Sequence, residues 1–196
     1  MPARVWITLV LTTAVGAACR PHIPMPPVRA VPSVVDDLGP RVHAHWAPYL
    51  RAAGLDYPPA ELALLAFKRE RRLEVWGRAD GPWRKIDAHP ILAASGIEGP
   101  KLREGDGQVP EGFYRIVAFN PNSRFHLSMM VDYPNADDVA LAEGEGRTDL
   151  GGEIFIHGGA RSIGCLAMGD RAIENLFVLV ADVGMERVQV ILAPRD

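Results

Sequence analysis

The chain has 196 residues, enough for one ordinary domain, and its 48% hydrophobic and 23% charged residues are typical of a folded protein with a packed core. Its 24 acidic residues outnumber its 21 basic residues, so the net charge is −3. This argues against a nucleic-acid partner, because such partners are bound by clustered positive charge. The presence of only two cysteines, Cys19 and Cys165, excludes a disulfide-dense scaffold.

The first 18 residues have the features of a secretory signal peptide. Arg4 supplies a positive charge, residues 5–15 are apolar apart from three threonines, and residues 16–18 are the small residues that a signal peptidase requires. Cys19 follows directly, so the junction also resembles a lipobox, in which the cysteine is lipidated and becomes the mature N-terminus. Either form of cleavage predicts an exported protein of the periplasm or cell envelope, and lipidation of Cys19 would also anchor it to a membrane.

A tether and the first helix of the predicted domain follow this signal. Residues 19–36 are rich in proline and show no helical period, so we interpret them as an extended tether. Residues 37–54 have the pattern of a short helix that ends at Gly54. This helix opens a predicted catalytic domain that covers residues 37–196.

Apolar residues beyond this helix mostly follow the two-residue period of β-strands. The run 113–119 is apolar nearly throughout, which suits a strand covered on both faces. Asp170 is a plausible N-cap for a helix that Gly184 ends. The sequence therefore predicts a mainly β fold with helical decoration, in the α+β class. The expected strands are 61–66 and 73–76, paired as a hairpin, then 113–119 and 125–131, also paired, and finally 153–156 and 188–192.

Two long segments between the strands are rich in glycine and charge. Residues 94–112 hold five glycines and two prolines, and residues 134–152 form a second segment of this kind. Loops of this length without secondary structure are usually functional or mobile. We expect a functional role for the first segment, because its ends run directly into strands.

The residues with the most chemical significance lie between 154 and 170. His157 ends an apolar strand, and Cys165 follows eight positions later. A thiol needs a neighbouring base to form a thiolate at neutral pH, and an imidazole can serve as that base. The backbone N–H groups of Gly164 and Cys165 could face an oxyanion. This spacing also occurs by chance, and Cys165 could equally be a small core residue or pair with another chain.

The same segment carries a specific resemblance. The residues IHGG and SIGCLAMGD resemble the active-site signature of the YkuD-type L,D-transpeptidase family, and more narrowly its YafK/DpaA-like branch. Four further stretches resemble that branch in the same order: FKRERRLEVW, AASGIEGPKLREGDGQVPEGFYRI, NPNSRFHLSM and DYPNADD. The resemblance implies a β-sandwich-like domain with its cysteine on a loop before a helix. It also implies action on the stem peptides of peptidoglycan.

The family pattern assigns roles to individual residues. Cys165 matches the nucleophile, and His157 matches the general base. The carbonyl of Gly158 would orient the imidazole, Gly164 matches an oxyanion-hole position, and Ser162 occupies the Ser/Thr place of the motif. The sequence departs from the wider family at 163, where isoleucine replaces the common histidine, and at 166–168, where no arginine is present.

These assignments predict an amidase that hydrolyses the bond between a diaminopimelate stem and an attached protein or peptide through a thioester on Cys165. The alternatives are an L,D-transpeptidase and a non-catalytic peptidoglycan-binding module. No cofactor and no metal are implied, because the histidines and cysteines do not have the spacing of metal ligands. The candidates for substrate contact are Ser162, His126, Arg124, Arg161 and Lys101, in which the cationic side chains would hold stem carboxylates.

Overall fold

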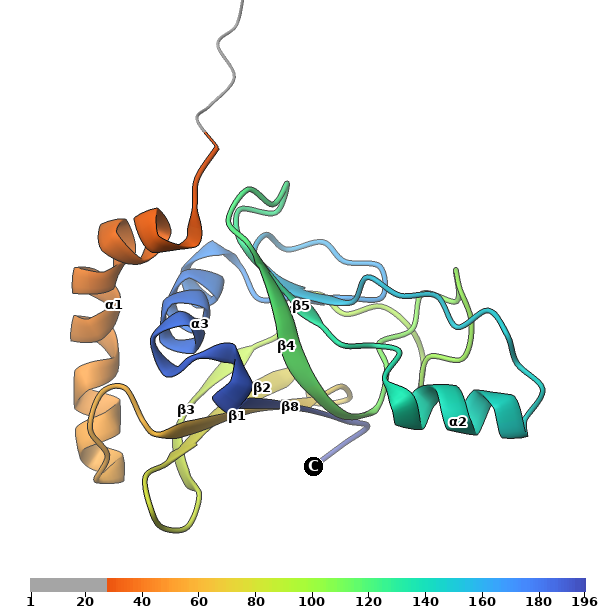
Figure 1. Ribbon diagram of the computed structural model, residues 1–196, viewed down its shortest axis with the longest axis horizontal. Helices are drawn as coiled ribbons and strands as arrows, with labels where there is room; N and C mark the ends of the chain where they lie inside the picture. Colours follow the sequence, from red (N-terminus) through yellow and green to blue (C-terminus); the bar gives the residue numbers. More distant parts are fainter. Residues whose placement is uncertain (1–27) are drawn as a thin grey trace, which may run out of the picture.

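The computed structural model describes residues 28–196, so the predicted signal peptide, Cys19 and the first half of the predicted tether lie outside the described residues. The described chain folds into one eight-stranded sheet with three α-helices (Figure 1), which confirms the predicted α+β class. In chain order the elements are α1 (Val31–Ala53), β1 (Glu61–Phe67), β2 (Arg72–Arg78), β3 (Arg84–Pro90), β4 (Gly112–Asn120), β5 (Ser128–Val131), α2 (Ala136–Gly144), β6 (Phe155–His157), β7 (Leu166–Ala167), α3 (Asp170–Val183) and β8 (Val188–Ala193).

The sheet has the strand order β3-β2-β1-β8-β4-β5-β6-β7. Strands β1 and β2 form the predicted hairpin around the charged tip, and β8 lies parallel to β1. Strand β4 joins the two halves of the sheet, because residues 112–115 pair with β8 whereas residues 116–120 pair with β5. The sheet curls at this strand (Figure 1), and the short strands β5, β6 and β7 form the half that carries the site.

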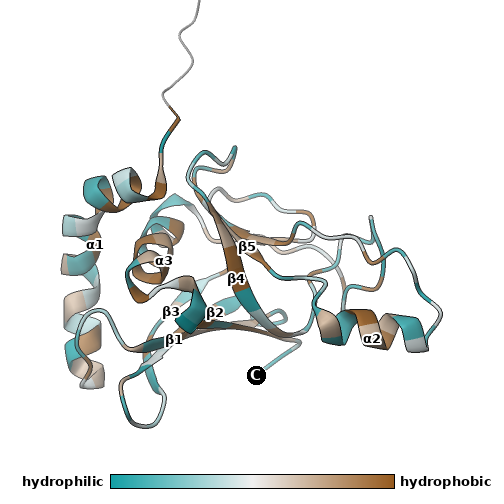
Figure 2. Cartoon of the chain, in the orientation of Figure 1, coloured by the Kyte–Doolittle hydropathy of each residue, from teal (hydrophilic) through white to brown (hydrophobic). Residues whose placement is uncertain are grey.

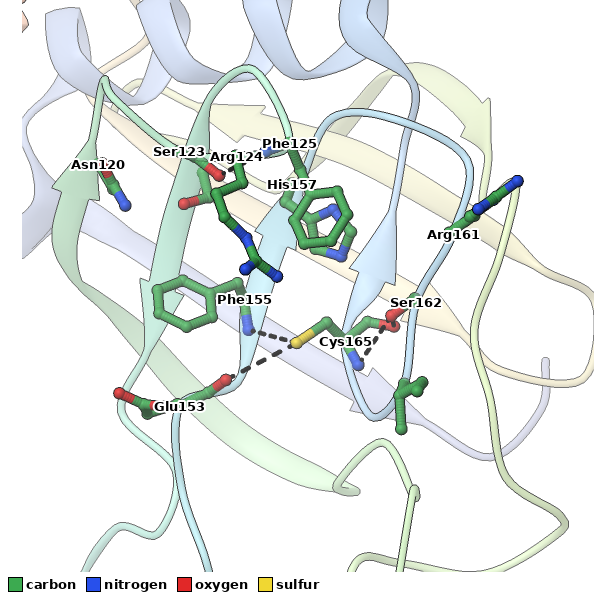
Figure 3. A pocket seen from close by; sticks show the side chains of 12 residues that line it. Asn120, Ser123, Arg124, Phe125, Glu153, Phe155, His157, Arg161, Ser162 and Cys165 are labelled. Carbon is green, nitrogen blue, oxygen red and sulfur yellow. Dashed lines mark hydrogen bonds between the residues drawn. The ribbon is translucent and has the colours of Figure 1, made fainter. Parts of the chain in front are cut away.

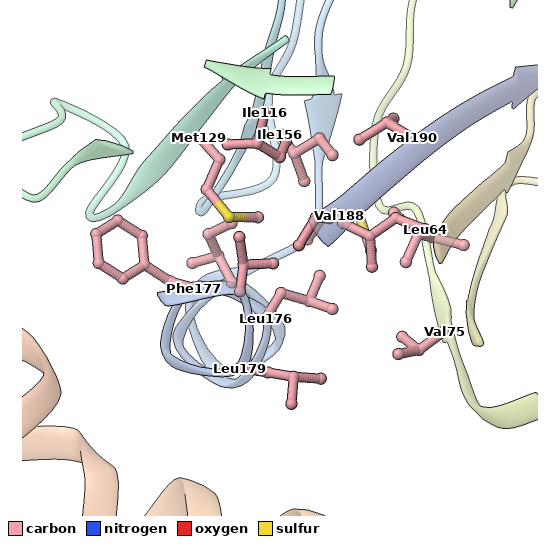
Figure 4. Close-up of a cluster of buried hydrophobic side chains, with 14 of the residues drawn as sticks. Leu64, Val75, Ile116, Met129, Ile156, Leu176, Phe177, Leu179, Val188 and Val190 are labelled. Atoms are coloured by element: carbon pink, nitrogen blue, oxygen red, sulfur yellow. The ribbon is translucent and has the colours of Figure 1, made fainter. Parts of the chain in front are cut away.

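Helix α3 forms the centre of the hydrophobic core. It is the helix with the strongest brown colour in Figure 2, and Leu176 and Phe177 have no exposed surface. Figure 4 shows these side chains directed at residues of both sheet halves, among them Met129 on β5 and Val188 on β8. Full burial of one such side chain contributes about 1.5–3 kcal/mol, so α3 fixes the two halves of the sheet against each other.

Helix α1 covers the other side of α3. Trp46 is fully buried, and its indole N–H donates to the backbone carbonyl of Asn175 on α3 at 3.0 Å. The helix ends before Gly54, which has the left-handed conformation that glycine adopts without strain. It begins at Val31, earlier than predicted, so residues 31–36 of the predicted tether are helical. This start was not predicted because Pro32 continues the proline-rich pattern of the tether, although proline is well tolerated in the first turn of a helix.

Four other elements, namely β3, β4, α2 and β7, differ from the sequence prediction. Strand β4 is not covered on both faces, because Phe113 is 74% exposed and Val117 is 49% exposed. The segment 134–152 is not a continuous loop, since it contains α2, and β3 and β7 were not predicted. The segment 94–111 has no helix or strand, as predicted. No helix in the described part of the chain has the length and apolar character needed to cross a membrane.

Candidate active site

The pairing of β6 with β7 explains the spacing of the two predicted catalytic residues. These strands are parallel, with Ile156 opposite Leu166 and His157 opposite Ala167. Cys165 immediately precedes β7 and therefore lies beside Phe155, whose backbone N–H donates to the sulfur at 3.4 Å. The loop between the two strands thus returns the cysteine to the strand that carries the histidine.

His157 and Cys165 line one open cleft with a volume of about 660 Å³ (Figure 3). The cleft lies over β5 and β6, between the turn after β4 and the loop that precedes β7. Its lining combines polar and aromatic side chains: Asn120, Ser123, Arg124, Phe125, Ser128, Glu153, Phe155, His157, Arg161, Ser162, Ile163 and Cys165. Such a cleft can accept a peptide that carries both charged and apolar groups.

The orientation of the His157 ring is fixed. Its Nδ1 lies 2.6 Å from the carbonyl oxygen of Gly158, and because a carbonyl only accepts, Nδ1 carries the proton. The other ring nitrogen, Nε2, is then an acceptor. Phe125 packs against the ring, with the two centroids 4.7 Å apart. Burial lowers the pKa of the imidazole, and the bond to Gly158 opposes this only in part, so the ring is neutral at pH 7 and can take up a proton.

The Cys165 thiol is in a resting state. Its sulfur points toward Phe155 and the carbonyl of Glu153, to which it donates at 3.7 Å (Figure 3). In the described part of the chain no hydrogen bond joins the thiol to His157. Burial raises the pKa of the thiol, and the Glu153 carboxylate adds to this, while the Phe155 N–H opposes it. The thiol is therefore protonated at pH 7, and it must rotate toward His157 before it can lose its proton.

The two backbone N–H groups predicted to bind an oxyanion, those of Gly164 and Cys165, already donate to serine hydroxyls. The Gly164 N–H donates to the Ser95 hydroxyl at 2.6 Å, and the Cys165 N–H donates to the Ser162 hydroxyl at 3.0 Å. Gly164 has a φ of 81°, which requires glycine at this turn. In this structure the pair does not form an open oxyanion hole, so a substrate oxygen would have to displace at least one serine hydroxyl.

Of the five predicted substrate contacts, three line the cleft and two do not. Arg124, Arg161 and Ser162 line it, and Figure 3 shows the Arg124 guanidinium directed inward and that of Arg161 directed outward. His126 instead contacts Glu174 on α3, with its Nε2 at 2.8 Å from the carboxylate. Lys101 is buried outside the cleft, where it pairs with Asp106 at 2.8 Å.

The position of His126 outside the cleft has a backbone cause. His126 has a φ of 74°, and β5 begins only at Ser128, so the expected alternation of side chains from residue 125 does not apply. Lys101 is held outside the cleft by Asp106, which lies in the same irregular loop. Three further parts of the site were not predicted: Ser95, Phe125 and the backbone of Phe155. Only the expectation of a functional loop at 94–112 pointed to Ser95.

No group of three or more metal-ligating side chains is assembled within residues 28–196. The groups that line the cleft include a thiol, an imidazole, hydroxyls, guanidinium groups and backbone amides. A cysteine beside an oriented neutral imidazole can carry out acyl transfer by forming and releasing a thioester.

Comparison with known proteins agrees with this reading of the cleft. The chain is 35% identical over 133 residues to the Escherichia coli K12 protein named "Putative L,D-transpeptidase YafK". The aligned region covers 65% of this chain and 52% of that protein. The chain thus spans about half the length of this curated relative.

Solved structures with the same architecture include the helical cell shape determining protein Pgp2 from Campylobacter jejuni. It superposes with a TM-score of 0.57 at 28% identity, over 69% of this chain and 48% of that one. The K307A mutant of Pgp2 has a TM-score of 0.57 at 26% identity, over 79% of this chain and 56% of that one. The family model for the YkuD L,D-transpeptidase catalytic domain matches residues 63–190, a range that includes both His157 and Cys165. The chain therefore belongs to the YkuD family of L,D-transpeptidase catalytic domains.

Proposed function

We propose that the protein is an exported cysteine acyl-transfer enzyme that acts on peptidoglycan stem peptides, and that it works as an amidase. The observation that carries this proposal is that Cys165 and a ring-oriented, neutral His157 line the same open cleft. Membership in the YkuD family supports the reaction class. The likeness to a cell shape determining protein supports a substrate in the cell wall.

The proposed reaction begins with rotation of the Cys165 side chain toward His157. The imidazole Nε2 takes the thiol proton, and the thiolate attacks the amide carbonyl of the substrate, forming a C–S bond and an oxyanion. When the C–N bond breaks, the imidazolium gives its proton to the leaving amine. Water, deprotonated by the same imidazole, then attacks the thioester, so that a carboxylic acid leaves and the thiol is restored.

The cleft also has a group that suits a stem peptide. The Arg124 guanidinium enters the cleft, lies 6.0 Å from the Phe125 ring and has no carboxylate partner among residues 28–196. A guanidinium binds a carboxylate through two parallel hydrogen bonds. We therefore assign Arg124 to a carboxylate of the diaminopimelate stem, with Ser162 and Arg161 at the edge of the same cleft.

Hydrolysis is proposed in preference to cross-linking. A cross-linking enzyme must hold a bulky amine beside the thioester and exclude water, which takes a second groove walled by a lid or long loop. Only residues 158–164 separate the base from the nucleophile, so the wall on this side is small. The bond proposed for cleavage is the amide that joins a diaminopimelate stem to an attached protein or peptide. An L,D-transpeptidase is the second candidate, since the family to which the chain belongs is named for that activity.

The decisive experiment allows the thioester to react either with water or with an amine. The mature protein is incubated with a defined stem–peptide conjugate and excess D-amino acid, and the products are resolved by mass spectrometry. Free stem as the main product supports the amidase, whereas efficient incorporation of the D-amino acid or new diaminopimelate bridges overturns it in favour of the transpeptidase. Binding of the conjugate without turnover, equal in wild type and Cys165→Ala, would instead identify a non-catalytic peptidoglycan-binding module.

Export of the protein is part of the proposal and depends on residues 1–27. A signal peptide at 1–18 would deliver the domain to the periplasm, where its substrate lies. Lipidation of Cys19 would keep it at a membrane, at the end of a tether that runs to the start of α1 at Val31. The attached protein or peptide is defined by its chemistry: it is joined to the diaminopimelate of the stem through an amide bond, to which it contributes either the acyl group or the amine.

A further inference from the structure

The peptide that joins Gly158 to Gly159 connects the catalytic base to helix α3. At one end its carbonyl oxygen accepts the Nδ1–H of His157 at 2.6 Å. At the other end its N–H donates to the Asp170 carboxylate at 2.8 Å. Because a peptide unit is planar, the bond at one end sets the direction of the group at the other. The orientation of the Gly158 carbonyl toward His157 therefore depends on Asp170.

The neighbouring peptides are held by the backbone, but this one is not. The N–H of Gly158 donates to the carbonyl of Leu127 at 3.0 Å, and the carbonyl of Gly159 accepts from the N–H of Gly169 at 2.9 Å. Within residues 28–196, the peptide between the two glycines has only the two side-chain partners, His157 and Asp170. Glycine on both sides offers no Cβ to resist rotation, so this peptide can turn at low cost.

A rotated peptide would damage the base. It would direct its N–H, in place of its carbonyl, toward the protonated Nδ1 of His157, and two donors would then face each other. The ring would lose its fixed tautomer, and with it the free lone pair on Nε2. Packing agrees with a tight arrangement here, because a Cβ on Gly158 would lie 2.8 Å from the Asp170 carboxylate.

From this geometry we infer that Asp170 is a positioning residue, which orients the general base through the Gly158–Gly159 peptide. The inference rests on the proposed role of His157. Asp170 is exposed to solvent, so water screens its charge and its contribution is mainly the hydrogen bond. The other charged groups that share the cleft with His157 are Arg124, Glu153 and Arg161. The predicted N-cap role of Asp170 is not observed, because Gly169 occupies the N-cap and Asp170 caps a distant loop instead.

The test compares two substitutions that differ in one hydrogen bond. Asp170→Ala removes the acceptor, and Asp170→Asn keeps a side-chain oxygen at the same place without the charge. With the stem–peptide conjugate, Asp170→Ala should lower kcat by about 10–100-fold with little change in KM, because the base is displaced and not the substrate. Asp170→Asn should stay within about threefold of wild type. Glu174→Gln, another carboxylate substitution on α3, is the matched control and should leave kcat unchanged.

A second measurement does not require any substrate. In proteins labelled with ¹⁵N-histidine, the hydrogen-bonded Nδ1–H of His157 should give a signal that exchanges slowly with water in wild type, Asp170→Asn and Glu174→Gln. The same signal should broaden or vanish in Asp170→Ala. A retained signal and full kcat in Asp170→Ala would overturn the inference, and so would equal impairment of Asp170→Asn and Asp170→Ala. If wild type shows no turnover, the proposed function fails, while the histidine signal still decides the role of Asp170.

Discussion

Replacement of Gly158 by alanine tests how tightly the base is held. A Cβ at this position would lie 2.5 Å from the carbonyl oxygen of Phe125, 2.8 Å from the Asp170 carboxylate and 3.1 Å from the Ile173 side chain. The first contact is with backbone, which cannot move aside as the end of a side chain can. Gly158 is also buried, so the methyl group has no route to solvent. Gly158→Ala therefore forces the base-bearing loop away from the loop around Phe125.

The expected size of this effect follows from overpacking a well-packed site. Such substitutions cost about 1–3 kcal/mol of unfolding free energy. In a domain of this size, each 1 kcal/mol lowers Tm by about 2–4 °C, so Gly158→Ala should unfold about 2–12 °C below wild type. Since the displaced carbonyl orients His157, kcat measured well below Tm should also fall, by about tenfold or more.

The matched control for this substitution is Gly144→Ala at the end of α2. No atom lies within 4 Å of a Cβ built there, and the position has no positive φ. This variant should keep the wild-type kcat, with a stability equal to wild type or higher by about 0.5 kcal/mol. Thermal unfolding followed by circular dichroism, together with turnover of the stem–peptide conjugate, provides both readouts. Wild-type Tm and kcat in Gly158→Ala would refute the reasoning.

Three further predictions concern the thiol, the base and the N-terminus. Cys165→Ala should abolish turnover and leave Tm nearly unchanged. Iodoacetamide should alkylate the wild-type thiol slowly at pH 7, and the alkylation rate should keep increasing with pH beyond the range of an ordinary thiol, because burial raises the Cys165 pKa. Fast alkylation at pH 7 would contradict the resting state. His157→Ala should lower kcat by about 10²–10⁴-fold, whereas His126→Ala should lower kcat far less, because His126 lies outside the cleft. A larger loss of kcat in His126→Ala than in His157→Ala would contradict the assignment of His157 as the base. Cys19→Ser should release a membrane-bound protein into the soluble periplasmic fraction if Cys19 is lipidated, and wild type found only in that fraction would indicate plain signal cleavage.

Local sequence signals predicted the elements whose partners are close in the chain. The first hairpin has alternating apolar residues on both sides of a charged tip, and α3 has an apolar face at helical spacing with Gly184 at its end. Helix α2 was missed because it is short and its apolar residues Val139 and Leu141 are exposed, so it shows no buried face. Its N-cap was nonetheless readable, since Asn135 and Asp138 form a capping box.

The site was predictable in composition but not in geometry. The residues of the motif indicated that His157 and Cys165 work together, yet the parallel pairing of β6 with the two-residue β7 cannot be read from so short a strand. The occupation of the Gly164 N–H by Ser95 depends on a contact between residues 69 positions apart. The orientation of the thiol depends on Phe155 and Glu153, which lie beside Cys165 only because β6 and β7 pair. Neither kind of contact has a local pattern in the sequence.

Substrate binding has to reorganise the resting site, and Arg124 is the residue best placed to supply the free energy. Opening the oxyanion donors breaks the bonds from Gly164 to Ser95 and from Cys165 to Ser162, each with a net value of about 1 kcal/mol. Binding energy gained at a distant part of the substrate can be used for such rearrangements. A carboxylate held by Arg124 would provide it, since charge-assisted bidentate pairs are stronger than neutral hydrogen bonds.

The loss of this contact should therefore lower kcat and not only raise KM. Arg124→Ala, or a conjugate in which the stem carboxylate is amidated, should each lower kcat/KM by about 10–100-fold, which corresponds to about 1.4–2.8 kcal/mol. Applied together, the two changes should cost little more than one of them, because both remove the same ion pair. Arg171→Ala, an exposed arginine on α3, is the control and should respond to amidation as wild type does. If amidation lowers kcat/KM equally in wild type and Arg124→Ala, the carboxylate is bound elsewhere, and the substrate must open the site by another contact.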